Sequence, residues 1–476
     1  MRMGTVLGLF AACVVVTGLF CNAVLGADGK ENPSSDLQGK AAVRGSYIIR
    51  NAYVMTMDPA IGDFQHGDVL VQNGVIVKVG ADLGKPDAQN INGEGMIVMP
   101  GFVEAHWHMW NTFWRGVVND RPEWAYFSMF RTAQFFQPND SYLSVRLALT
   151  EALNAGITTV HNWANNVLGP QFADAELKAH TEIGLRARWS YGAPHGPDID
   201  WNDVSRVRKQ WIDESNGLLT LGIAATELYH QGTTIDDVKN TFAKARELGL
   251  PISIHSVMPG NPPGYQALLS NKLLGPDVQV LHACGSEAHA ADIAATGAKI
   301  SMSPIVEPLY SGMVPPIPEA MKAGVPLSIS IDNSAIGAAD MFSLMRTLLA
   351  SAHTKTRDAK SPSARQLLEM ATMGGAKDLG LQNVTGSITP GKRADLIMVR
   401  TTDINMQAAP DIDAAWLLVM SGRPENVDTV MVDGRILKRN GVVTVVDPSR
   451  VMKEAAQAFT ALRARANLPP LNSMTK

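Results

Sequence analysis

Residues 99–111 read MPGFVEAHWHMWN, an apolar run that ends in two histidines, His106 and His108, separated by one tryptophan. On a β-strand, residues two positions apart point to the same face, so both imidazoles would face one ligand. In a chain with 11 histidines, an isolated H-x-H pair also arises by chance. The rest of the sequence must therefore show whether this pair has partners.

Seven further short apolar runs follow, and helix-like segments such as 236–249 and 287–297 separate most of them. The first run covers residues 97–106, and the others cover 158–163, 186–192, 218–225, 251–256, 278–284, 299–304 and 326–333. Strands that alternate with helices are typical of parallel sheets. Eight such units predict an α/β fold built on a (β/α)8, TIM-like barrel.

Two β-rich segments with Gly, Asn and Asp turns flank these units. We expect residues 46–96 and 385–445 to form one small composite β-sandwich domain, because short strands punctuated by such turns predict hairpins. The barrel would then occupy residues 97–384. Residues 446–476 would form a C-terminal helix, over 448–465, and a tail.

The N-terminus resembles a secretory signal peptide, predicted over residues 1–26. Arg2 precedes an apolar stretch over residues 5–20, and small residues follow near position 26. A membrane anchor is the alternative, although this stretch is short for a spanning helix. Residues 27–45 predict a flexible linker. We expect an exported protein, periplasmic or secreted, with no integral membrane span in the mature chain and with Cys284 as its only cysteine.

The composition fits a globular protein with a large core, since 46% of residues are hydrophobic and 18% are charged. The net charge is −4, and no basic run stands out, which gives no indication of nucleic acid as a partner. The expected partner is a small molecule. The sequence leaves open whether the chain forms a homo-oligomer.

Ionisable residues gather where the predicted strands end, and this end of a TIM-like barrel carries the chemistry. They are His106 and His108 after the first run, His161 near the end of the second, His255 after the fifth, His282 after the sixth, Glu307 after the seventh and Asp332 after the eighth. Each residue alone fits a core or loop position. Together they would bury unpartnered polar groups at a high cost, which a bound metal ion would remove. Imidazoles and a carboxylate suit Zn²⁺ or Fe²⁺.

These motifs, with the closing phrase GSITPGKRADLIMV at 386–399, resemble the amidohydrolase superfamily, in the group that includes cytosine deaminase and the triazine hydrolases. The resemblance covers about residues 46–445. It implies a metal-dependent hydrolase that uses a metal-activated water on a non-peptide C–N bond of an amide, an amidine or an amino-heteroaromatic ring. The implied metal ligands are His106, His108, His255 and Asp332. A single ion, Zn²⁺ before Fe²⁺, is expected because residues 218–231 hold no lysine that could bridge two metals.

The resemblance also implies roles in proton transfer. Asp332 would be the general base as well as a ligand, and His282 would contact the activated water or the substrate. Deaminases of this group carry a glutamate three residues after the fifth-strand histidine, where this chain has Met258. The chain also lacks the histidine that many relatives carry after the seventh strand. Glu307 is the candidate that would replace the missing carboxylate, and the alternative is a lid residue held by a backbone amide.

Residues 109–150 are rich in aromatic side chains, which could line a pocket for a flat or aromatic molecule. We expect Trp110, Trp114, Trp163 and His161 to contact the substrate. The simpler interpretation for most of these aromatic residues is that they pack lid helices onto the barrel.

Three alternatives stay open at this point. The same barrel could carry out hydrolytic dehalogenation or decarboxylation, because a fold does not fix its chemistry. The chain could also be a noncatalytic, exported, metal-dependent binding protein. A scaffold on a decayed barrel is supported only by the missing glutamate and histidine.

Overall fold

The computed structural model describes residues 43–256, 263–406 and 412–469. The predicted signal peptide, residues 27–42 of the predicted linker and Met258 lie outside the described residues. Within the described ranges, every helix is too short or too polar to cross a lipid bilayer.

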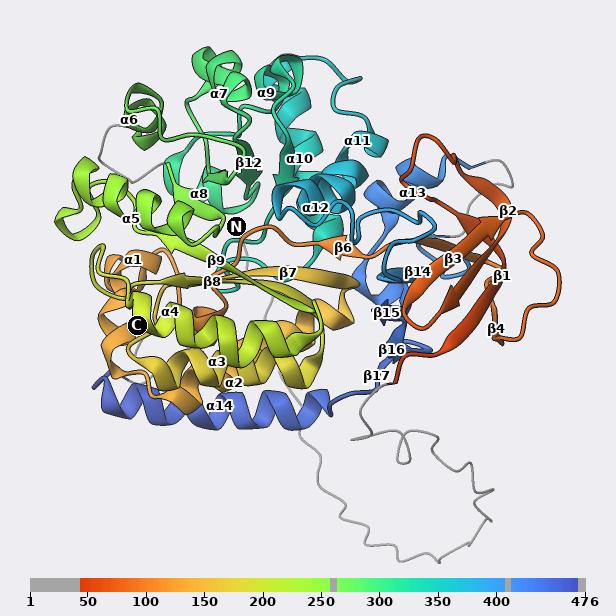
Figure 1. Ribbon diagram of the computed structural model, residues 1–476, viewed down its shortest axis with the longest axis horizontal. Coiled ribbons are helices and arrows are strands. Elements are labelled where there is room, and N and C mark those ends of the chain that lie inside the picture. The colour runs from red at the N-terminus through yellow and green to blue at the C-terminus, as the bar shows by residue number, and fades with distance from the viewer. Residues whose placement is uncertain (1–42, 257–262, 407–411, 470–476) are drawn as a thin grey trace, which may run out of the picture. The chain divides into compact units, whose positions relative to one another are not determined.

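Eight parallel strands form the barrel sheet in their chain order, which confirms the predicted α/β barrel (Figure 1). Each strand pairs in parallel with its neighbour. The strands are β6 (Phe102–Val103), β7 (Ile157–Ala164), β8 (Arg186–Gly192), β9 (Leu219–Ala225), β10 (Ile252–His255), β11 (Val278–Leu281), β12 (Lys299–Met302) and β13 (Leu327–Ile329). Short apolar runs bounded by turn residues are typical of buried parallel strands, which explains why the sequence predicts these strands.

The seam between the first and last barrel strands closes just beyond their ends. Trp107 forms a parallel bridge with Asp332, and the Asp332 amide donates to the His106 carbonyl at 2.9 Å. The buried Glu104 carboxyl reinforces the seam, because its Oε1 accepts from the amides of His106 at 2.8 Å and Ile331 at 3.1 Å. Two residues that close the barrel, His106 and Asp332, are therefore themselves predicted to bind metal.

A second, mixed sheet of nine described strands combines both ends of the chain. Its strands are β1 (Ser46–Val54), β2 (Phe64–Gln72), β3 (Val75–Gly80), β4 (Gln89–Asn92), β5 (Met96–Pro100), β14 (Leu396–Arg400), β15 (Val427–Val432), β16 (Arg435–Arg439) and β17 (Val442–Val443). Asp433 and Gly434 join β15 to β16 with φ of 55° and 70°, as a two-residue turn with two positive φ angles requires. The N-terminal and C-terminal segments thus share one sheet, as the sequence predicted.

The first apolar run differs from its prediction as one barrel strand over 97–106. The chain instead forms β5 in the mixed sheet, paired with β14 and β1, and then the short β6 in the barrel. The break is at Gly101, where an added Cβ would lie 2.1 Å from the Thr158 side chain. The close approach of Thr158 at the point where the chain changes sheets therefore requires glycine at this residue.

Helices surround the barrel strands (Figure 1). They are α1 (Tyr126–Met129), α2 (Pro138–Asn154), α3 (Pro170–Ile183), α4 (Trp201–Val207), α5 (Ile235–Glu247), α6 (Gly264–Ser270), α7 (Ala290–Thr296), α8 (Val306–Ser311), α9 (Ile317–Ala323), α10 (Met341–Thr356), α11 (Ala364–Glu369), α12 (Gly375–Asp378), α13 (Ala414–Ser421) and α14 (Pro448–Arg465). α14 has the predicted bounds and lies along α2, where Arg146 pairs with Glu454 at 2.7 Å.

Candidate active site

The residues predicted to bind metal lie where barrel strands end. His106 follows β6, His255 is the last residue of β10, His282 follows β11 and Asp332 follows β13. The backbone angle φ is 58° at His282 and 66° at Asp332, in the left-handed region that residues other than glycine rarely adopt. Such strain is concentrated at functional sites, where it aims a side chain in a required direction.

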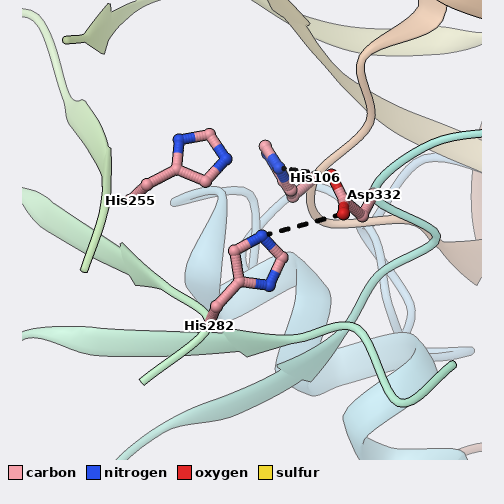
Figure 2. A group of neighbouring side chains, drawn as sticks. All are labelled: His106, His255, His282 and Asp332. Carbon is pink, nitrogen blue, oxygen red and sulfur yellow. Dashed lines mark ion pairs between the residues drawn. The ribbon is translucent and has the colours of Figure 1, made fainter. Parts of the chain in front are cut away.

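Four of these side chains point toward one another at one end of the barrel (Figure 2). Ligand atoms of His106, His255, His282 and Asp332 all lie within 4.8 Å of each other. Asp332 Oδ1 lies 3.3 Å from His106 Nε2, and its Oδ2 lies 3.9 Å from His282 Nε2. These four side chains are close enough together to hold a metal ion.

His108 belongs to the same cluster. Its Nε2 lies 3.3 Å from His255 Nε2 and 3.4 Å from Asp332 Oδ1. The structure therefore brings together all four residues predicted as ligands, with His282 beside them.

The protonation state of three imidazole rings suits them to bind a metal ion. Burial lowers the pKa of His106, His108 and His255, and neighbouring imidazoles lower the pKa of His106 and His255 further, so these rings are neutral. Neither ring nitrogen of His106 has a hydrogen-bond partner among the described residues, although both are buried. Buried polar atoms are normally partnered, and neutral imidazole nitrogens beside a carboxylate are donors that Zn²⁺ prefers.

His282 differs from the other three imidazoles. Burial alone would lower its pKa, but the bond to Glu307 and the charge of Asp332 outweigh burial and raise the pKa. His282 Nδ1 lies 3.2 Å from Glu307 Oε1, which also accepts from the Ser303 amide at 2.9 Å. The other ring nitrogen of His282, Nε2, faces Asp332 Oδ2 at 3.9 Å, so His282 is placed to contact a group bound beside that carboxylate. Glu307 thus combines both predicted arrangements, the carboxylate in the site and the contact with a backbone amide.

A cavity of about 350 Å³ opens over this cluster. Aromatic rings supply much of its wall, and they are Trp110, Tyr126, Phe127, Phe130, Trp163 and Tyr310. Trp163 packs edge-on against two of the histidine rings, with its ring centre 4.5 Å from that of His255 and 4.9 Å from that of His108. The wall suits a flat, largely apolar molecule whose reacting atom reaches the cluster.

Of the residues predicted to contact substrate, Trp110 and Trp163 line the cavity. Trp114 is fully buried behind Trp110, with the two ring centres 4.9 Å apart, and is not among the described residues that line it. His161 is also fully buried, and its Nδ1 and Nε2 bond to the Ala105 carbonyl and the Ser190 hydroxyl inside the barrel. The structure thus places Trp114 and His161 in the core.

Three polar residues near the site were not singled out from the sequence. Glu227 follows β9 and lines the cavity, with Oε2 3.7 Å from His255 Nδ1. Asn165 follows β7 and bonds to both His108 and Trp110. Glu104 lies two residues before His106. Glu227 and Asn165 could have been found by examining every polar residue after a predicted strand, whereas Glu104 lies inside the run predicted as one strand over 97–106 and directly follows the shorter β6 of the structure.

Comparison with known proteins identifies the family of this chain. The model of the amidohydrolase family matches residues 97–437. A 5'-deoxyadenosine deaminase from Methanosarcina mazei is 29% identical over 446 residues, which cover 88% of this chain and 99% of that relative. A 5-methylthioadenosine/S-adenosylhomocysteine deaminase from Desulforudis audaxviator is 28% identical over 437 residues, 87% of this chain and 98% of that one.

Solved structures show the same fold. An adenosine deaminase from Xanthomonas campestris with bound zinc has a TM-score of 0.78 at 23% identity, covering 89% of this chain and 100% of its own. An atrazine chlorohydrolase from Arthrobacter aurescens complexed with zinc has a TM-score of 0.75 at 21% identity, covering 87% and 100%. The family match spans more than half of the chain and includes the whole histidine and aspartate cluster. This chain belongs to the amidohydrolase family and is a metal-dependent hydrolase of carbon–nitrogen bonds other than peptide bonds.

Proposed function

We propose that this protein is a zinc-dependent aminohydrolase that removes an amino group from a flat heteroaromatic molecule. The observation that carries the proposal is the convergence of His106, His108, His255 and Asp332 at the base of an aromatic-walled cavity. The names of the similar deaminases, which give adenine nucleosides as their substrates, support an aminated ring as the substrate class.

The donor set would hold one divalent ion, Zn²⁺ before Fe²⁺. The ligands would be His106, His108, His255 and Asp332. When bound, such an ion acts as a Lewis acid and lowers the pKa of water from near 16 to about 7.

The protein side chains supply proton transfer and orientation. Asp332, with one carboxylate oxygen toward His106 and the other toward His282, is placed to accept the proton of the attacking water. His282 is placed to donate a hydrogen bond that orients the attacking oxygen toward the ring carbon. Glu307 holds His282 Nδ1 and lines the cavity, so it would return a proton to the departing nitrogen. Trp110 and Trp163 would position the ring and exclude water.

A panel of aminated heterocycles, nucleosides and N-acyl compounds tests this proposal, with the zinc-loaded protein and ammonia or amine release as the readout. We expect ammonia release from at least one aminated ring and loss of that release in the Asp332→Asn variant. Release from N-acyl compounds alone would contradict ring deamination while leaving hydrolysis of C–N bonds intact.

Hydrolytic dehalogenation is the second candidate, and the identity of residue 258 favours it. A halide leaves a ring carbon without being protonated, so this chemistry has less need for the glutamate that Met258 replaces. Halogenated counterparts of the same rings belong in the panel, and halide release without ammonia release would select this candidate.

A further inference from the structure

We propose that Asn165 is a positioning residue whose single side-chain oxygen fixes the His108 tautomer and anchors the aromatic wall of the cavity. The inference rests on the proposed function, because it concerns how the metal-binding nitrogen of His108 is presented. Asn165 directly follows β7, whereas His108 and Trp110 belong to the segment after β6, so the contact joins two loops at the mouth of the barrel.

The chemistry of tryptophan sets the orientation of the Asn165 amide. Trp110 Nε1 lies 2.7 Å from Asn165 Oδ1. An indole nitrogen can only donate a hydrogen bond, so the atom it meets must be the amide oxygen rather than the amide nitrogen. The usual ambiguity between the oxygen and nitrogen of an asparagine side chain is therefore removed here by the bonding partner.

The same oxygen then fixes the proton on His108. His108 Nδ1 lies 2.9 Å from Asn165 Oδ1, and a carbonyl oxygen only accepts, so Nδ1 carries the proton. In the neutral ring, Nε2 is left with its lone pair. The Nε2 atom lies 3.3 Å from His255 Nε2 and 3.4 Å from Asp332 Oδ1, so its lone pair is available to a cation that these residues would share.

Asn165 Oδ1 thus links metal binding at His108 to the aromatic wall of the cavity at Trp110. Trp110 lines the cavity and packs against Phe130 with ring centres 5.7 Å apart. Loss of the Asn165 oxygen would release both the His108 ring and the Trp110 indole. Loss of the group that orients a metal-binding histidine typically weakens metal affinity by about 10- to 100-fold.

Two substitutions separate the hydrogen bond from the shape of the side chain. Asn165→Leu keeps the size but removes the acceptor, whereas Asn165→Asp keeps an acceptor oxygen in the same place. Asn166→Leu is the matched control, because Asn166 also lines the cavity but bonds to the Ala133 carbonyl at 3.3 Å. The readout is the zinc dissociation constant of the purified full-length proteins, measured by competition with a chromogenic chelator, with thermal melting as a check of folding.

We expect the zinc dissociation constant to rise by about 10- to 100-fold in Asn165→Leu. It should stay within a few-fold of wild type in Asn165→Asp and in Asn166→Leu. Unchanged zinc affinity in Asn165→Leu, or equal weakening in Asn165→Asp and Asn165→Leu, would overturn the positioning role while leaving the proposed function in place. A wild-type protein that fails to bind zinc would overturn the proposed metal site itself, and the inference with it.

Discussion

Replacing Glu176 by glutamine should change how the stability of the protein depends on pH. Glu176 lies on α3 and is fully buried against β7 and β8. Its Oε2 accepts from Asn162 Nδ2 and Trp189 Nε1, each at 2.9 Å. Burial raises the pKa of Glu176 to about 7, although these two hydrogen bonds lower it. The charged form would leave Oε1 buried without a donor among the described residues, which favours the neutral acid.

The sign and size of the effect follow from proton linkage. The unfolded chain loses the Glu176 proton near its ordinary pKa of 4.5, while the folded chain keeps the proton until about pH 7. The folded state binds more protons in this window, so its stability falls as the pH rises. A pKa difference of about 2.5 corresponds to about 3 kcal/mol of the free energy of unfolding, at roughly 1.4 kcal/mol per unit.

Urea unfolding of the wild type and of Glu176→Gln at pH 5 and pH 8 measures this effect. Glutamine keeps an acceptor oxygen and is neutral at both values, so the difference between the two proteins isolates the carboxyl group. The wild type should lose about 2 to 3 kcal/mol relative to the variant between pH 5 and pH 8. Parallel stability changes in the two proteins would refute the reasoning, since they would mean that Glu176 is not held protonated.

The remaining predictions concern the site and the N-terminus. Asp332→Asn should lower kcat by at least about 100-fold in a steady-state assay, while metal analysis should still find some bound zinc. Full activity of this variant would show that Asp332 is not the general base. Trp163→Ala should raise KM by about 2- to 10-fold with a smaller change in kcat, because a ring contact contributes about 0.5–1.5 kcal/mol. We propose that the N-terminus is cleaved on export, so the mass of the mature protein should correspond to a chain that begins near residue 27. A periplasmic or secreted protein that retains Met1 would contradict cleavage.

The barrel could be predicted because each strand is a short apolar run between turn residues. The exception is the run at 97–106, whose hydrophobicity is continuous although the chain changes sheets within it. The break depends on the close approach of Thr158 to Gly101, where any side chain would begin 2.1 Å from that of Thr158. The contact joins residues far apart in the sequence, and the local signal of the break is the Pro100–Gly101 dipeptide, which is typical of turns.

The candidate site was partly predictable for a similar reason. His106, His255, His282 and Asp332 could be found because barrel chemistry lies at strand ends, and all four are there. His161 shows the limit of that rule. It lies three residues before the last residue of β7, and its depth inside the barrel depends on the stagger of neighbouring strands.

The aromatic segment shows a second limit. Trp110 and Trp114 lie on the same short 3-10 helix, yet only Trp110 is among the described residues that line the cavity. Which of the two faces the substrate depends on how that helix packs against Phe130 and Tyr126. The sequence shows that aromatic rings gather beside the site, but tertiary packing decides which of them face the cavity.

Titration of the metal-stripped protein with zinc, with ammonia release from an aminated heterocycle as the signal, tests the central claim most directly. His106, His108, His255 and Asp332 form one cluster, so activity should rise linearly with added zinc and stop rising at about one ion per chain. Activity that is the same in the stripped and zinc-loaded protein would contradict a metal-dependent reaction at this cluster.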